Sequence, residues 1–428
     1  MSPEMLRSTT ILRAERHLPL APVLWRWVGA LFALLEEQGI PWLVLRKGEE
    51  LPNTIGFDVD VLVDSNAIDG LTTEAHRMAA GLGLVFQMRR KAGGARLAAF
   101  LVEPNSVTRK WVLIDLQSRV SAPGYADLDV HAIATRTIAA AGMNVRVPNA
   151  DWAKALSERH AARKRDLATL ASIARPKKLR VRLGRILFFR LPFIHRHRPL
   201  FFAVCGPDGV GKSTTIALML DMLRGYPLDV RVLHHTTYAK EKERRMVDEQ
   251  RAGNGPLRSL PYRIMRALWR GFVPNAIKRA LGGIVAESKY ARRLNAAIGE
   301  DFFAGRLTLM DRYVYDRWLK MRLLPRPGFQ HLALRILCRV MRPPCVTLAL
   351  ADDATKVFER KQELSPAQIA DYTTALAALC RQVGAPYYHL AIVGREPEAV
   401  AAEAVGVLLQ YSGSELFDAI GRFEMQGA

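Results

Sequence analysis

Residues 200–220 read LFFAVCGPDGVGKSTTIALML, and the order of patterns in this stretch decides the fold of the carboxyl-terminal half of the chain. An apolar run predicts a β-strand over 200–204, and a second apolar pattern predicts a helix over 214–226. Between them, Gly206-Pro-Asp-Gly-Val-Gly-Lys-Ser213 separates a first glycine from a Gly-Lys-Ser triplet by four residues. A strand, a glycine-rich loop and a helix in this order predict a cradle for phosphate groups.

The loop carries the groups that bind a nucleoside triphosphate. Glycines allow the backbone NH groups to point at the phosphates, and the following helix presents its positive end to them. Lys212 is expected to reach the outer phosphates, and the Ser213 hydroxyl is expected to hold Mg²⁺. The predicted ATP-binding set comprises Gly206, Asp208, Gly209, Val210, Gly211, Lys212, Ser213 and Thr214. A loop that binds nucleotide without transferring phosphate is the alternative.

Further strands are predicted around this loop, at 230–233, 307–310, 345–350 and 387–391. Long helical patterns separate them. Strands that alternate with helices form parallel sheets, so this half is predicted to be an α/β domain with a doubly wound parallel sheet.

Two charged segments follow predicted strands and are candidates for catalysis. Asp311 and Arg312 come at the end of the strand at 307–310, and ligands of such sheets bind beyond the carboxyl ends of strands. Asp311 is expected to orient magnesium, and Arg312 is expected to clamp a phosphate through its planar fork. Arg360 and Lys361 are expected to close over the phosphates as a lid. A structural ion pair at 311–312 and a solvated helix face at 360–361 are the alternatives.

Together, these three elements resemble the thymidylate kinase family of nucleoside monophosphate kinases. The resemblance implies a parallel five-stranded sheet, ATP with Mg²⁺ as cofactors, and transfer of a phosphoryl group to an acceptor. It also implies that Asp208 faces a sugar hydroxyl of the acceptor, Arg312 its phosphate, and Arg360 the transferring group. The family's ThrArgGluPro-like segment is replaced by HisHisThrThrTyrAla at 234–239, so the acceptor is expected to be a nucleotide or a sugar-type molecule rather than thymidylate itself.

The amino-terminal half is predicted to be a small mixed sheet with helices. Its expected strands are 42–45, 59–63, 84–88, 96–102 and 111–116, and its expected helices are 21–38, 66–83 and a charged helix at 151–174. Asp58 and Asp60 lie two residues apart, so their carboxylates share one face, which Asp115 could join across the sheet. Three such carboxylates suit the magnesium ions of nucleotidyl transfer. The alternative is the solvated face of an edge strand.

This half resembles the minimal nucleotidyltransferase fold shared with polymerase-beta-like enzymes, over residues 20–170. The family's Gly-Ser pair ahead of the acidic strand is replaced by Lys47 and Gly48, which removes a hydroxyl that helps to grip the triphosphate. The resemblance therefore implies the fold, with a nucleotidyl transfer activity that is lost or altered.

Charge and composition set the expected domains and partners. We expect a nucleotidyltransferase-like domain at 1–174, a basic linker at 175–199, the kinase domain at 200–412 and a tail at 413–428. The chain has 62 Lys and Arg against 41 Asp and Glu, a net charge of +21 that attracts polyanions. The linker and the basic insert at 256–293 mix cations with apolar residues, which favours contact with an anionic membrane surface. Packing on the domains with the cations solvated is the alternative.

The sequence contains no apolar run long enough to span a membrane, no signal peptide and no paired cysteine spacing. A cytoplasmic protein is therefore expected, with peripheral contact to the inner membrane surface. Nucleic acid is disfavoured because no recognition motif is found. The sequence predicts an ATP-dependent phosphotransferase fused to a nucleotidyltransferase-like domain, an arrangement that resembles proteins of cell-envelope polysaccharide synthesis. It leaves the oligomeric state open. The alternative is an ATP-binding regulatory or scaffold protein that docks on anionic membrane or nucleic acid.

Overall fold

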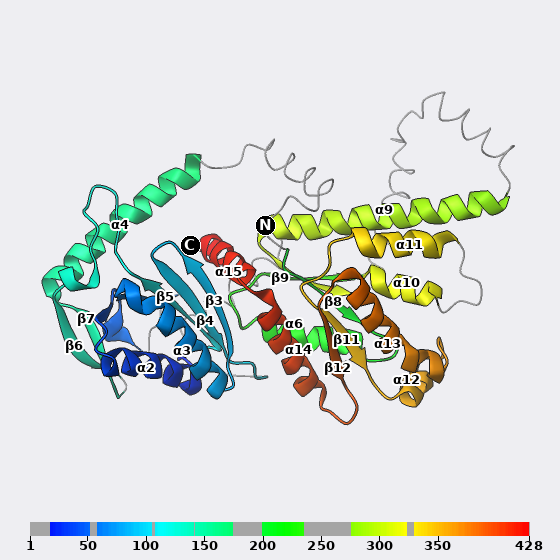
Figure 1. The fold of residues 1–428 in the computed structure, drawn as a ribbon, viewed down its shortest axis with the longest axis horizontal. Coiled ribbons are helices and arrows are strands. Elements are labelled where there is room, and N and C mark those ends of the chain that lie inside the picture. The colour runs from blue at the N-terminus through cyan, green and yellow to red at the C-terminus, as the bar shows by residue number, and fades with distance from the viewer. Residues whose placement is uncertain are drawn as a thin grey trace. The chain divides into compact units, whose positions relative to one another are not determined.

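The structure is a computed structural model of the chain, and it describes residues 18–51, 58–104, 108–140, 142–173, 199–234, 275–322 and 329–427. The described residues form two compact units (Figure 1). Unit 1 comprises those of Met1–Leu183, Met219–Asp229 and Ala401–Ala428, and unit 2 those of Gly184–Leu218 and Val230–Val400. The predicted linker segment 175–198 and residues 256–274 of the predicted basic insert lie outside the described residues.

Unit 1 is built on a mixed five-stranded sheet with the order β1-β2-β5-β4-β3. Its strands are β1 (Trp42–Val44), β2 (Val59–Val63), β3 (Val85–Lys91), β4 (Gly94–Phe100) and β5 (Trp111–Gln117). β2 and β5 are parallel, and the other neighbours are antiparallel. Every strand overlaps a predicted one, so the apolar patterning located all of them.

Helices and a separate hairpin complete the amino-terminal part of unit 1. They are α2 (Pro22–Glu37), α3 (Ile68–Gly81), α4 (Ala150–Ile173), the 3-10 turns Gly48–Glu50, Ser65–Ala67 and Val130–Ala132, and the antiparallel pair β6 (Thr135–Ala140) and β7 (Met143–Pro148). The sequence did not predict this pair, because most of β6 is exposed and therefore carries no apolar alternation.

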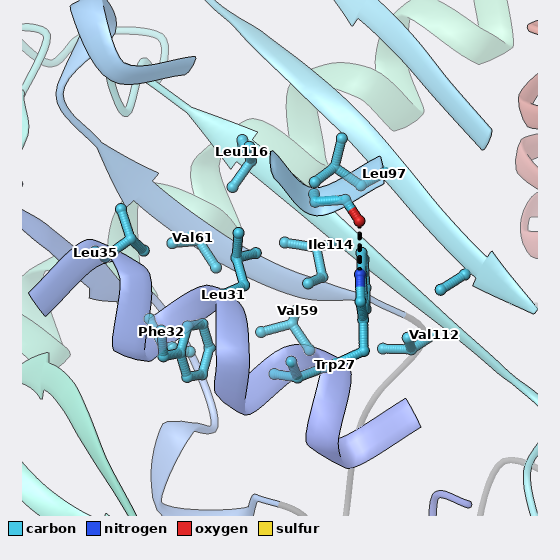
Figure 2. Close-up of a cluster of buried hydrophobic side chains, with 14 of the residues drawn as sticks. Trp27, Leu31, Phe32, Leu35, Val59, Val61, Leu97, Val112, Ile114 and Leu116 are labelled. Atoms are coloured by element: carbon cyan, nitrogen blue, oxygen red, sulfur yellow. Dashed lines mark hydrogen bonds between the residues drawn. The ribbon is translucent and has the colours of Figure 1, made fainter. Parts of the chain in front are cut away.

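The core of this part lies between α2, α3 and one face of the sheet (Figure 2). Trp27 on α2 is fully buried, and its indole NH donates a hydrogen bond of 2.9 Å to the carbonyl of Ala75 on α3. Val59 and Val61 of β2 point into the same core. Because side chains alternate along a strand, Asp60 must point to the opposite face.

Unit 2 contains a five-stranded sheet in which every pair of neighbouring strands is parallel, with the order β12-β11-β8-β10-β9. The strands are β8 (Phe201–Cys205), β9 (Val230–His234), β10 (Leu307–Asp311), β11 (Thr347–Ala351) and β12 (Tyr387–Ala391). The predicted α/β fold class with a parallel sheet is confirmed. The connections run to one side of β8 for β9 and β10 and to the other side for β11 and β12, so β8 lies at the topological switch point of the sheet.

The helices that follow these strands are α6 (Lys212–Leu223), α9 (Asn275–Ala304), α10 (Val314–Arg322), α11 (Phe329–Val340), α12 (Ala354–Arg360), α13 (Pro366–Val383) and α14 (Pro397–Ser412). Local chemistry sets the ends of α13, since Ser365 and Gln368 form a reciprocal capping box and Gly384 ends the helix in the left-handed conformation.

Residues 415–427, within the segment predicted as a tail, form helix α15 (Glu415–Gly427) of unit 1. Leu416 and Ile420 of this helix are fully buried. Asp418 pairs with Arg89 on the edge strand β3, and the Gln87 amide donates to the carbonyl of Leu409 at 2.9 Å. The end of the chain therefore covers an edge strand of unit 1.

Replacing Trp27 should show how much of unit 1 depends on the contact between α2 and α3. We expect Trp27→Ala to destabilise unit 1 by about 3–5 kcal/mol through the cavity it leaves, and Trp27→Phe by only about 1 kcal/mol through the lost hydrogen bond. Native-state hydrogen exchange of the β2 amides measures both. Lys154→Ala, on an exposed position of α4, is the control. Equal protection of β2 in all three variants would contradict this role of Trp27.

Candidate functional site

The loop between β8 and α6 has a backbone that requires glycine. Gly209 has a φ of 93°, and a Cβ there would lie 3.2 Å from the carbonyl of Val357. A Cβ on Gly206 would lie 2.9 Å from the carbonyl of Leu350. The loop is thus pressed against neighbouring elements, and Val210, which is fully buried, anchors it. These close approaches fix the backbone of the loop at residues 206–211.

Lys212, at the first position of α6, is buried, and its ammonium group lies inside the loop. It donates to the carbonyls of Gly206 at 2.7 Å and Pro207 at 2.8 Å. Burial lowers the pKa of this ammonium, and the carboxylates of Asp316 and Asp311 oppose that shift. Ser213 is exposed in the first turn of α6.

Asp208 joins the loop to β10 and α10. Its carboxylate is buried and accepts from three cations: the Arg312 guanidinium, the Lys320 ammonium at 2.8 Å and Lys212 at 3.4 Å. Arg312 is among the residues predicted from the sequence, whereas Lys320 is not. The contact of Lys320 with Asp208 joins residues 112 positions apart in the sequence, so no local pattern points to it.

The carboxyl end of β10 is strained at the position that points into the site. Arg312 has a φ of 73°, which non-glycine residues rarely adopt, and its backbone NH donates to the carbonyl of Val204 on β8 at 3.1 Å. Beside it, Asp311 lies 3.2 Å from the His234 ring, and its other carboxylate oxygen is buried with no hydrogen-bond partner among the described residues. A buried acceptor of this kind fits a ligand such as a hydrated metal ion.

Asp316 carries a further buried carboxyl group near the loop. It is buried on α10 and accepts from the backbone NH of Tyr313 at 3.3 Å. Burial raises its pKa, and Lys212 is the strongest opposing influence. Lys212 and Asp316 therefore favour each other's charged form within the site.

Arg360, the predicted lid residue, is the last residue of α12 and lies at the rim of the loop. Its guanidinium pairs with Asp352 at 2.9 Å and is 3.4 Å from the carbonyl of Gly209. Asp353, by contrast, caps α12 by accepting from the backbone NH groups of Thr355 and Lys356, which lower its pKa. Asp353 therefore serves as the N-cap of α12.

A second cluster of predicted residues lies in unit 1. Asp58, Asp60 and Asp115 each offer a carboxylate oxygen, and these oxygens all lie within 4.8 Å of one another. The cause is the register of the sheet, in which Asp60 and Asp115 are partners on the parallel strands β2 and β5. A set of three carboxylates fits a hard divalent cation such as Mg²⁺.

Each of these carboxylates also has a basic partner that was not predicted from the sequence. Arg46 pairs with Asp60, with its Nε at 2.9 Å from the carboxylate. Lys91 pairs with Asp115, and Arg96 approaches Asp58 at 3.2 Å. The cations compensate the charge of the cluster, so a metal ion at this place has to compete with them.

The segment at residues 47–48, after β1, is also shaped by packing. Lys47 has a φ of 56°, and its ammonium lies 3.5 Å from Glu50. Gly48 is buried, and a Cβ there would lie 2.4 Å from Val147 of β7. Lys47 therefore takes part in a local turn, and Gly48 gives the close approach to β7.

The predicted residues thus fall into two separate clusters, one in each unit. The loop residues with Asp311, Arg312 and Arg360 lie together in unit 2, and the three aspartates lie together in unit 1. Within the part of the chain that the structure describes, no helix combines the length and the apolar character needed to cross a membrane.

No protein-family model matches the sequence, and no curated protein matches it. Among solved structures, the chain is similar to a thymidylate kinase from Ehrlichia chaffeensis, with 11% sequence identity and a TM-score of 0.28. That similarity covers 50% of this chain and 99% of the kinase. A likeness with this TM-score is too weak to support a function, so the function is inferred from the geometry of the two clusters.

Proposed function

We propose that the protein is an ATP-dependent phosphotransferase of the nucleoside monophosphate kinase type, which transfers the γ-phosphoryl group of ATP to a nucleotide or sugar-type acceptor. One observation carries the proposal. The loop at 206–211 lies at the switch point of a parallel sheet, encloses the Lys212 ammonium, and is tied through Asp208 to Arg312 at the end of the neighbouring strand.

The donor side of the proposed site is the loop and the start of α6. The backbone NH groups of the loop and the positive end of the helix would bind the β- and γ-phosphates. Lys212 would exchange its hydrogen bonds to two loop carbonyls for bonds to the outer phosphates. Ser213 and Asp311 would hold Mg²⁺, which neutralises charge on the transferring group when it is bound.

The acceptor side is the group of cations around Asp208. Arg312 can bind a phosphate or another anionic group through two parallel hydrogen bonds, and Lys320 adds a second positive charge. Asp208 would then be released to accept a hydrogen bond from an acceptor hydroxyl. Arg360 lies at the rim, 3.4 Å from the loop, where it can stabilise charge on the group in transfer.

We further propose that residues 1–174 form a nucleotidyltransferase-like domain, separate from the kinase domain at 200–412. Its support is the mixed sheet of unit 1 and the convergence of Asp58, Asp60 and Asp115. Because each of the three carboxylates is already paired with a basic side chain, we expect the nucleotidyl transfer activity of this domain to be weak or lost.

Replacement of the loop lysine tests the donor side. We expect Lys212→Ala to lower acceptor-stimulated ADP release by about 100-fold or more, because the charge that stabilises the transferring phosphoryl group is removed. The assay is a screen of the purified full chain against nucleoside monophosphates and sugars, with Lys289→Ala, an exposed position of α9, as the control. If Lys212→Ala turned over at the rate of the wild type, the loop would have no role in phosphoryl transfer. Tight ATP binding with no stimulation by any acceptor would favour a regulatory protein.

Replacement of Lys320 tests the acceptor side separately. We expect Lys320→Met to raise the KM for the acceptor about tenfold, because one charge-assisted hydrogen bond is lost, and to leave the KM for ATP unchanged. Lys289→Met is the matched control. An increase in the KM for ATP alone would instead assign Lys320 to the donor side.

Metal binding tests the aspartate cluster of unit 1. In the absence of nucleotide, we expect Asp60→Asn to weaken Mn²⁺ binding about tenfold and Lys91→Met to strengthen it by a similar factor, because the first removes a ligand and the second a competitor. Titration calorimetry measures both, with Asp151→Asn, an exposed position of α4, as the control. Affinities that neither variant changes would show that the cluster is a network of ion pairs only.

A further inference from the structure

Helix α11 exposes a stripe of aliphatic side chains. Leu332, Ile336 and Val340 follow one another at intervals of four residues and are 53%, 53% and 55% exposed. That spacing places all three on one side of the helix. They are half of the large apolar side chains that are exposed among the described residues, the others being Tyr125, Val393 and Tyr411. Such clustering, unlike scattered exposure, marks an interaction surface.

The opposite side of α11 already serves the core of unit 2. Leu334 and Cys338 are buried there, and the His331 ring stacks on Trp318 of α10 with the ring centroids 5.5 Å apart. The helix therefore has an apolar face in the core and a second apolar stripe outside it, and a helix that is apolar on two sides needs a partner for each.

The charges beside the stripe indicate the chemistry of that partner. Arg335 and Arg339 are exposed next to the stripe, and the sequence of α11 contains no Asp or Glu. Helix α9, which packs along α11 (Figure 1), carries exposed Lys289, Arg292 and Glu300. An apolar stripe flanked by arginines and free of acids is the composition of a helix that lies in the interface of an anionic bilayer.

We propose that α11 docks the protein on a lipid bilayer that is rich in anionic headgroups. Leu332, Ile336 and Val340 would enter the boundary between headgroups and acyl chains, while Arg335 and Arg339 would extend along the surface to the headgroup phosphates. This contact is independent of the phosphotransferase proposal and differs from contact through the basic linker. Because only three aliphatic side chains would be inserted, binding is reversible.

A second copy of the chain fits this stripe less well than a bilayer does. A symmetric dimer would bring the arginines of α11 close to those of the partner, with no acidic residue on either α11 to compensate them. A bilayer with anionic headgroups supplies the missing negative charge.

Flotation with lipid vesicles tests the proposal on the full chain. The vesicles contain equal parts of phosphatidylglycerol and phosphatidylcholine, with pure phosphatidylcholine as the neutral comparison. We expect the wild type to float with the anionic vesicles only, and Leu332→Gln with Ile336→Gln to lower its partition coefficient by about tenfold or more. Val393→Gln is the matched control, because Val393 is as exposed as Val340 but lies elsewhere.

A fluorescent label distinguishes insertion of the stripe from attraction of the whole basic protein. The four cysteines are buried, so a polarity-sensitive dye can be attached selectively to Ile336→Cys or, as control, to Val393→Cys. We expect the emission to rise several-fold on anionic vesicles for the first site only. The proposal would be overturned if the double variant floated as well as the wild type, or if the emission of a dye at position 336 did not change on anionic vesicles. So would sedimentation showing that the wild type is a dimer and the double variant a monomer.

Discussion

The Asp208 carboxylate is the point on which the candidate site depends. It is buried in the loop after β8, and three cations converge on it, from the start of α6, from the residue after β10 and from α10. A buried carboxylate is costly unless it is paired, so this arrangement holds the loop, the end of β10 and α10 in one geometry. In the proposed reaction, the acceptor would meet the same cations.

The parallel sheet explains why these groups meet at all. β8, β10 and β11 end at the same edge, so the residues that follow each of them are gathered there, although they are far apart in the chain. Gly209 allows the backbone of Val357, in α12, to approach the loop closely. The positive φ of Arg312 is the local strain that aims its side chain at Asp208.

Unit 1 uses a similar balance of charges with a different outcome. Three carboxylates converge because two parallel strands place Asp60 and Asp115 side by side. Each is compensated by a basic side chain, and these come from the segment after β1 and from β3 and β4. A site of this kind is stable without a ligand, and a cation that enters it must displace a lysine or an arginine. In unit 2 the excess is of positive charge instead, because three cations surround the Asp208 carboxylate.

The sequence by itself determined the α/β class, ten of the twelve strands found among the described residues, the loop at 206–213 and the carboxylates of unit 1. These are local or periodic features, which contiguous residues express without help from the rest of the chain. Only the tertiary structure decided the pairing of Lys320 with Asp208, the cations beside the aspartates, the pairing of the exposed strand β6 with β7, and the outward stripe of α11. Each of these depends on which distant residues share a register, a face or a burial environment, and periodicity along the chain does not encode that.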